Sequence, residues 1–126
     1  MVIIDTSVAY KFFAPQEEGY KEAVNILRRH IEGSETILIP DLLLYELANV
    51  WSTKTKLETN RIATNLNDLK VANFEIERVN FGLIAEAIEL SRSYSVSVYD
   101  ACYAVLAKKS HCTLITADSK FAEKLN

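Results

Sequence analysis

Four carboxylates stand where apolar segments of this chain end or where its buried helices begin. They are Asp5 in V-I-I-D-T-S, Glu46 in L-Y-E-L-A-N, Asp100 in V-Y-D-A-C-Y and Asp118 in L-I-T-A-D-S-K-F. Carboxylates brought together would repel one another by roughly 3 kcal/mol per pair at ~5 Å and an effective dielectric constant of ~20. Hard cations such as Mg²⁺ or Mn²⁺, which prefer oxygen ligands, relieve that repulsion. The sequence therefore predicts a divalent-metal site, provided that the fold gathers the four acids.

Each aspartate also has a plainer interpretation as a helix N-cap. Asp, Ser and Thr side chains accept hydrogen bonds from the free backbone amides of a helix's first turn, and this alone would explain Asp5, Asp100 or Asp118. Glu46 differs, because nearly all the remaining positions of its helix are apolar. Asn49 lies one turn further on the same side, and the pair indicates a site, with a solvated Asn49 as the alternative.

The elements that must position these acids alternate along the chain. Strands are expected at 2–5, 36–39, 74–79 and 113–116, with the third at an edge because Glu75 and Glu77 alternate with apolar residues. Three helical patterns have apolar faces, formed by Tyr20, Ala23, Val24, Leu27 and Ile31, by Ile62, Leu66 and Leu69, and by Phe81, Ile84, Ala85 and Ile88. This alternation predicts an α/β layered domain with a mostly parallel sheet, and residues 1–126 are expected to form a single domain.

That architecture predicts where the acids meet. Ligands of open parallel sheets bind outside the carboxyl ends of the strands. Asp5 and Asp118 fall at or just past such ends, Glu46 follows the second strand by about two helical turns, and Asp100 opens a central apolar helix at 100–109. All four are therefore expected at one rim of the sheet.

Composition narrows the remaining classes. The chain has 126 residues, a net charge of −3 and no run of eighteen apolar residues, so a soluble, cytoplasmic protein without a membrane span is expected. The charge gives no global basic field for nucleic acid, although local basic clusters occur at 28–30, 54–56 and 108–111. Cys102 and Cys112 lack C-x-x-C spacing, and a zinc site built from them with His30 and His111 is a weaker alternative.

The four acidic motifs together resemble those of the PIN-domain ribonucleases, and in particular the compact VapC-like toxins of prokaryotic toxin–antitoxin pairs. The resemblance rests on the strand into D-T-S, on I-P-D-L-L-L-Y-E-L-A-N-V-W, on S-V-Y-D-A-C-Y-A-V-L-A and on L-I-T-A-D-S-K-F, in the family's order. It implies a three-layer fold with a sheet of four or five strands flanked by helices. The family usually adds a last strand after the Asp118 helix, and no apolar run for it is found before Asn126.

The resemblance also implies an activity and a set of roles. Asp5, Glu46, Asp100 and Asp118 would be the catalytic, metal-binding acids, holding Mg²⁺ or Mn²⁺ for hydrolysis of RNA phosphodiester bonds. Ser7 and Thr116 match the family's hydroxyl positions, and Asn49 matches the amide that follows its glutamate. These three side chains would orient a carboxylate or a metal-bound water without binding the metal themselves. Thr116 as an ordinary β-branched strand residue is an alternative.

Rival classes make different demands of the sequence. A receiver-type phosphoacceptor domain, or a phosphatase with D-x-D, needs a second acid shortly after the first strand, where this chain has Thr6 and Ser7. A catalytically inactive RNA- or protein-binding module of the PIN fold is the stronger rival.

The helix expected at 41–53 is more apolar than one core requires. Its crowded apolar residues predict a surface for partners, with Leu43, Tyr45 and Trp51 as contacts in a homodimer or with a cognate antitoxin. The alternative is that a neighbouring helix at 57–72 covers the surplus face.

Overall fold

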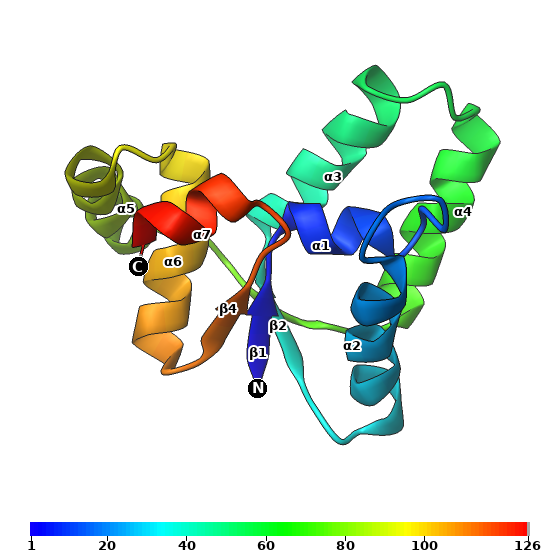
Figure 1. Ribbon diagram of the computed structural model, residues 1–126, viewed down its shortest axis with the longest axis horizontal. Helices are drawn as coiled ribbons and strands as arrows, with labels where there is room; N and C mark the ends of the chain where they lie inside the picture. The colour runs from blue at the N-terminus through cyan, green and yellow to red at the C-terminus, as the bar shows by residue number, and fades with distance from the viewer. Residues whose placement is uncertain (126) are drawn as a thin grey trace.

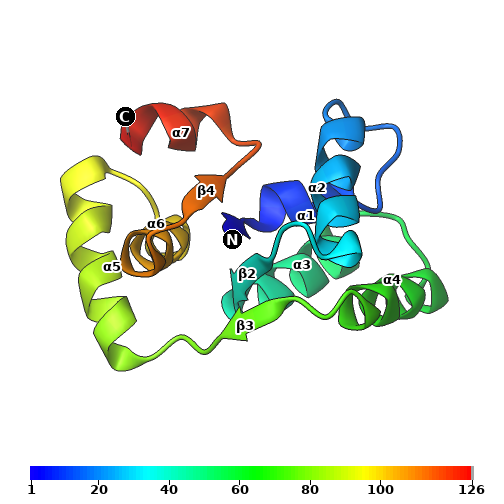
Figure 2. The same ribbon diagram turned by 90° about the horizontal axis from the view of Figure 1, so that it is seen from below.

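The computed structural model describes residues 1–125 as an α/β fold with a four-stranded sheet between two groups of helices (Figure 1). The strands pair in the order β3-β2-β1-β4, and every pair is parallel. Helices α5, α6 and α7 lie on one side of the sheet and α1, α2, α3 and α4 on the other (Figures 1 and 2). The predicted α/β architecture with a parallel sheet is therefore confirmed. The bounds are β1 Val2–Ile4, α1 Thr6–Lys11, α2 Tyr20–Glu32, β2 Ile37–Pro40, α3 Leu42–Thr53, α4 Thr59–Val71, β3 Glu75–Glu77, α5 Phe81–Tyr94, α6 Val98–Ser110, β4 Thr113–Ile115 and α7 Ser119–Leu125.

The four expected strands are all present; three are shorter than predicted, and β2 has the predicted length but begins one residue later. β1 ends at Ile4, so Asp5 lies just past the strand, and β3 is the exposed edge strand that the glutamates predicted. Four strands occur within residues 1–125, and the segment before Asn126 is helix α7, so the alternative of a fifth strand is not realised in the described part.

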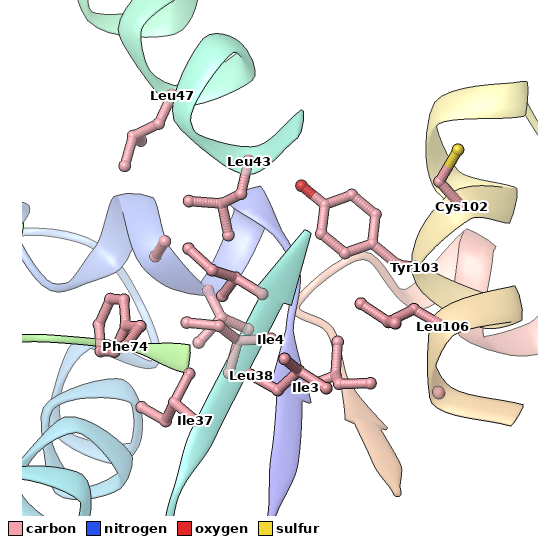
Figure 3. Close-up of a cluster of buried hydrophobic side chains, with 14 of the residues drawn as sticks. Ile3, Ile4, Ile37, Leu38, Leu43, Leu47, Phe74, Cys102, Tyr103 and Leu106 are labelled. Atoms are coloured by element: carbon pink, nitrogen blue, oxygen red, sulfur yellow. The ribbon is translucent and has the colours of Figure 1, made fainter. Parts of the chain in front are cut away.

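The core lies where the central strands meet α1, α3 and α6. Its largest fully buried side chains, several of them visible in Figure 3, are Trp51, Tyr103, Ile3, Ile4, Ile37, Ile39, Leu43, Leu47 and Pro40. β1 and β2 are apolar because helices cover them on both faces, as expected for interior parallel strands. β1 and β2 therefore position the rim of the sheet, which is the edge formed by the carboxyl ends of its strands.

The predicted apolar faces of the outer helices are partly wrong. In α5 the residues packed inward are Leu83 and Ala87, whereas Phe81, Ile84 and Ile88 are 93%, 37% and 47% exposed. This helix carries two apolar stripes, and periodicity alone does not say which one meets α6.

In two other helices most of the predicted face does pack inward. In α2, Ala23 and Leu27 contact the core as predicted, and Ile31 is 66% exposed. In α4, Ile62 and Leu69 contact the core as predicted, and Leu66 is 47% exposed. Among residues 1–125, no helix has the length and apolar character needed to cross a membrane.

Candidate active site

The carboxyl ends of β1 and β4 lie side by side because the two strands pair in parallel, with Ile4 opposite Ile115. The backbone amide of Asp5 donates to the carbonyl of Ile115 over 3.3 Å, which carries the pairing one residue beyond the strand. Asp5 and the loop that leads to Asp118 therefore share one rim, as the sequence predicted.

Asp5 is buried at this rim, with only 4% of its surface exposed. One of its oxygens, Oδ1, accepts hydrogen bonds from Ser7 Oγ at 2.5 Å and from the Val8 amide at 3.4 Å. Asp5 thus caps α1, as the plainer interpretation expected, and faces the rim as well. Burial raises the pKa of this carboxyl, and the hydrogen bonds from Ser7, Thr116 and Val8 only partly oppose that shift.

Glu46 reaches the same rim from the second turn of α3. Its Oε1 accepts from Thr6 Oγ1 at 2.9 Å and from the Tyr103 hydroxyl at 2.6 Å, and the two hydroxyls lie 3.0 Å apart. Tyr103 is 1% exposed and extends from α6 toward α3 (Figure 3). Burial, and next its hydrogen bond to Glu46, raise the Tyr103 pKa above its ordinary value, so the phenol remains a neutral donor.

Neither of these two donors was predicted from the sequence. A signal for Tyr103 was present, since a tyrosine inside a helix that is apolar on most sides needs a partner for its hydroxyl. Thr6 could have been noticed as the hydroxyl residue directly after Asp5.

Asp100 lies in the first turn of α6, and it does not begin the helix as the sequence suggested. The helix begins at Val98, and Ser97 is the cap, since its Oγ accepts from the Asp100 amide at 3.0 Å. The half-buried Asp100 carboxyl has a raised pKa, first because of burial and then because of the negative charges of Asp5, Asp118 and Glu46. The other three predicted acids are therefore close enough to Asp100 to act on it electrostatically.

Asp118 is exposed and caps α7, accepting from the Phe121 amide at 3.1 Å. Two hydroxyls fix the loop that carries it. Thr116 Oγ1 accepts from the Asp118 amide at 3.1 Å, and Ser7 Oγ accepts from the Ala117 amide at 2.8 Å. With Ser7 and Thr116 also 3.4 Å apart, both lie beside the acids as predicted, and Ser7 links Asp5 directly to the Asp118 loop.

Asn49 and two of the expected partner contacts are placed differently from the prediction. The Asn49 side chain is exposed and forms no hydrogen bond within residues 1–125, while its backbone carbonyl accepts from the Thr53 hydroxyl. Leu43 and Trp51 are 0% and 1% exposed, because α3 turns them into the chain's own core, where Trp51 packs edge-on against Phe13. Of the three predicted contacts only Tyr45, 75% exposed, is available to another molecule.

The donor set fits a hard divalent cation in its chemistry. All four side chains offer oxygen, and three of them raise the pKa of the fourth by their charge. Within residues 1–125, however, no three His, Cys, Asp or Glu side chains converge closely enough to hold an ion directly. Mg²⁺ usually keeps several waters and takes only one or two carboxylates directly, so a wider acidic rim suits it. The cysteines and histidines of residues 1–125 likewise form no group that could hold zinc.

Comparison with known proteins places this fold in one family. Residues 2–124 match the PIN domain family, and the chain belongs to that family. It is similar to Ribonuclease VapC3 of Pyrobaculum aerophilum, with 27% identity over 127 residues that cover 98% of this chain and 93% of VapC3.

Two solved structures share the fold. VapC20 of Mycobacterium tuberculosis, described as a toxin that cleaves the sarcin-ricin loop, has a TM-score of 0.76 at 15% identity, over 98% of this chain and 94% of that one. A chain of VapBC2 from Rickettsia felis, crystallised on a DNA fragment from its promoter, has a TM-score of 0.72 at 21% identity, over 98% and 92%. The predicted PIN-like, VapC-like fold is confirmed.

Proposed function

We propose that this chain is an endoribonuclease that hydrolyses RNA phosphodiester bonds with the help of Mg²⁺ or Mn²⁺, and that it is the toxin of a VapBC-type pair. The observation that carries the proposal is the complete acidic rim on a PIN fold, in which Asp100 is influenced by the charges of Asp5, Glu46 and Asp118. The similarity to a named VapC ribonuclease supports the choice of RNA as substrate.

In this mechanism the chain's own residues bind and orient. Asp5, Glu46, Asp100 and Asp118 would hold the cation, which when bound makes a water more acidic and offsets charge on the phosphate. Ser7 holds Asp5, while Thr6 and Tyr103 hold Glu46, so two of the four carboxylates are oriented before any ligand arrives. Preorganised groups of this kind need no rearrangement at the moment of reaction.

The two histidines of the chain are not placed as general bases. Both ring nitrogens of His30 are engaged, Nε2 with the Ala72 carbonyl at 2.8 Å and Nδ1 with the Ile37 amide at 3.0 Å. His111 caps the C-terminal end of α6, where its backbone has a positive φ. The carboxylates are therefore the groups that would orient the attacking water and accept its proton.

The experiment is a cleavage assay on structured RNA with Mg²⁺, with Mn²⁺ and with excess chelator. Metal-dependent products that disappear in chelator are expected. Full cleavage in chelator would exclude the metal mechanism, and RNA binding without cleavage under every condition would favour the inactive binding module.

The proposal also includes two assemblies. The chain forms a homodimer with a second copy of itself, and it binds a cognate antitoxin protein. Support comes from a groove of about 250 Å³ where α3, α5 and α6 meet, lined in part by the exposed side chains of Tyr45, Ile84 and Tyr99. Light scattering should find a dimer that Ile84→Glu converts to monomer, and a larger complex with the product of the adjacent gene. A strict monomer that ignores that product would remove the toxin assignment and leave a nuclease.

Two further parts of the proposal concern the chain as a whole. We place its action in the cytoplasm, where its RNA substrate would be met. We also take residues 1–126 as one functional domain, which a cooperative, single unfolding transition by two different probes would support.

A further inference from the structure

A cleft of about 410 Å³ opens beside the acidic rim. Thr6 and Ser7 line it, together with Tyr10, Lys11, Glu17, Val50 and Ala117. Thr6 and Ser7 are the hydroxyl residues that hold Glu46 and Asp5, so the cleft and the acids share a wall. If the scissile phosphate of an RNA strand lies at the acids, the strand next to it passes this cleft.

The charge on this part of the surface is unfavourable for RNA. Four carboxylates gather at the rim, and the chain as a whole carries −3. A phosphate next to the scissile one would lie beyond the first solvation layers of a cation at the acids, and it needs positive charge of its own. Lys11 is the only cationic residue among those that line the cleft in the described part of the chain.

Lys11 is held in place rather than extended into solvent. Its side chain is 16% exposed, and its Nζ donates to the Glu18 carbonyl at 2.6 Å. Its methylene chain passes over Gly19, where a Cβ would lie 3.6 Å from Lys11 Cδ and Cε, and Gly19 has a φ of +84°. A lysine fixed in this way loses little further conformational freedom when it binds an anion.

The ammonium group has bonding capacity left for a ligand. Its contact with Glu17 Oε1 is long, at 3.5 Å, and the Glu17 side chain is 43% exposed. An exposed pair of this kind contributes little, so an arriving phosphate oxygen can displace Glu17 while the Glu18 carbonyl keeps the ammonium in position. A lysine offers three donors, which is enough for both partners.

We infer that Lys11 is a positioning residue that binds a backbone phosphate of the RNA next to the one on which the acids act. This inference rests on the proposed ribonuclease function. Glu17 occupies the position of that phosphate in the free protein and competes with it.

The test measures binding separately from cleavage. A dye-labelled single-stranded RNA is titrated in excess chelator at several salt concentrations, and the slope of log K against log [salt] is compared between variants. Loss of one phosphate contact on a single strand lowers the slope by about 0.7, which is about fivefold in affinity at 0.1 M salt. Lys11→Gln should show this loss, Lys11→Arg should keep the wild-type slope, and Lys21→Gln, an exposed lysine of α2, is the matched control.

Glu17→Gln provides the opposite test, because removing the competing carboxylate should tighten RNA binding. If Lys11 only fastens the loop, Lys11→Gln will lower the melting temperature and leave the salt slope at the value of Lys21→Gln, which overturns the inference. Should Lys11→Gln fail to fold, an unchanged dissociation constant in Glu17→Gln overturns it instead. Wild type that binds no RNA in chelator at low salt overturns it too.

Cleavage then distinguishes this inference from the proposed function. Lys11→Gln should raise KM more than it lowers kcat, because the contact is made to a phosphate that does not react. Wild type that binds with the expected slope and cleaves no RNA would refute the ribonuclease and leave the phosphate contact intact.

Discussion

The two halves of the acidic rim are built in different ways. The half formed by Asp5 and Glu46 lies against the core, and three hydroxyls, those of Ser7, Thr6 and Tyr103, donate to its carboxylates. The half formed by Asp100 and Asp118 is more exposed, and its carboxylates have fewer and weaker ties to the core: Asp118 accepts from the Phe121 amide, and Asp100 is hydrogen-bonded to Ser97.

This difference separates two demands on a metal site. Donors fixed by the core set the direction in which an ion and its waters are bound, at the expense of burying charge. Exposed carboxylates lie in water, where charge is better tolerated, and leave room for a large substrate. The comparison therefore predicts that all four acids matter for cleavage while they differ in their effect on stability.

Replacing an acid by its amide should give the largest effect. Asp5→Asn, Asp100→Asn and Asp118→Asn should each lose several kcal/mol of transition-state stabilisation, or about a thousandfold in rate. In chelator, Asp5→Asn and Asp100→Asn should melt higher than wild type, by ~4 °C for a gain of ~1 kcal/mol, because burial disfavours the charge of Asp5, and burial and repulsion disfavour that of Asp100. Asp118→Asn should hardly change the melting temperature, since it is exposed and Asn caps helices as well as Asp does.

Thermal unfolding in chelator, beside the cleavage assay, checks this pattern. If Asp5→Asn and Asp100→Asn both melt below wild type without metal, the two carboxylates stabilise the fold and the proposed site is wrong.

Removing one hydroxyl of the buried half should have the next largest effect. Tyr103→Phe deletes the 2.6 Å donor to Glu46 and leaves Thr6 as the remaining one. Loss of a group that orients a metal ligand typically lowers activity by about 10 to 100-fold, and the lost hydrogen bond should destabilise the fold by ~1 kcal/mol. Tyr94→Phe, an exposed tyrosine of α5, is the control. A kcat for Tyr103→Phe within twofold of wild type would show that Glu46 does not depend on this donor.

The same contrast explains how much of the site the sequence predicted. Asp5 and Asp118 were expected at one rim because strand ends in a parallel sheet meet there, and the structure brings them there. The partners of Glu46 were not expected, because Thr6 and Tyr103 come together only after α1, α3 and α6 pack, at separations of 40 and 57 residues from Glu46. Hydrogen bonds over such distances leave no local pattern.

The fold was predicted to a similar degree. Alternating apolar runs and helical periods gave the parallel α/β architecture, since these patterns are local. Which residues of α5 and α2 face inward depends on where neighbouring helices lie, so Phe81 and Ile31 were expected on apolar faces and are exposed. The same limit applies to α3, where apolar residues were taken as a partner surface although Leu43 and Trp51 belong to the core.

The pH dependence of stability should sharpen the comparison further. Asp5 and Asp100 have pKa values raised above 3.8 in the folded protein, so the native state binds more protons than the unfolded state between 3.8 and the raised values. In chelator the two ionised carboxylates destabilise the folded state fully at neutral pH. This destabilisation is relieved as the pH falls through their pKa values in the folded protein.

Urea unfolding at a series of pH values measures this. Asp100→Asn is expected to be more stable than wild type by ~1 kcal/mol at neutral pH. This advantage should shrink as the pH approaches 3.8. An advantage that stays constant over that range would mean that the ionisation of Asp100 does not oppose folding. Activity should decline over the same range, because protons compete with metal for these oxygens.

The smallest effect is expected at Asn49, where sequence and structure give opposite expectations. The sequence suggested that Asn49 orients a carboxylate, whereas the structure places its exposed side chain one turn beyond the exposed Tyr45. Asn49→Ala should therefore change cleavage by less than about twofold, while Ser7→Ala, which removes both the donor to Asp5 and the acceptor of the Ala117 amide, should lower it about tenfold. Steady-state kinetics of the two variants under identical metal conditions decides the matter. A tenfold loss in Asn49→Ala would mean that this amide contacts RNA or a metal-bound water from the solvent side, and the rim would then have an exposed orienting group to match the buried ones.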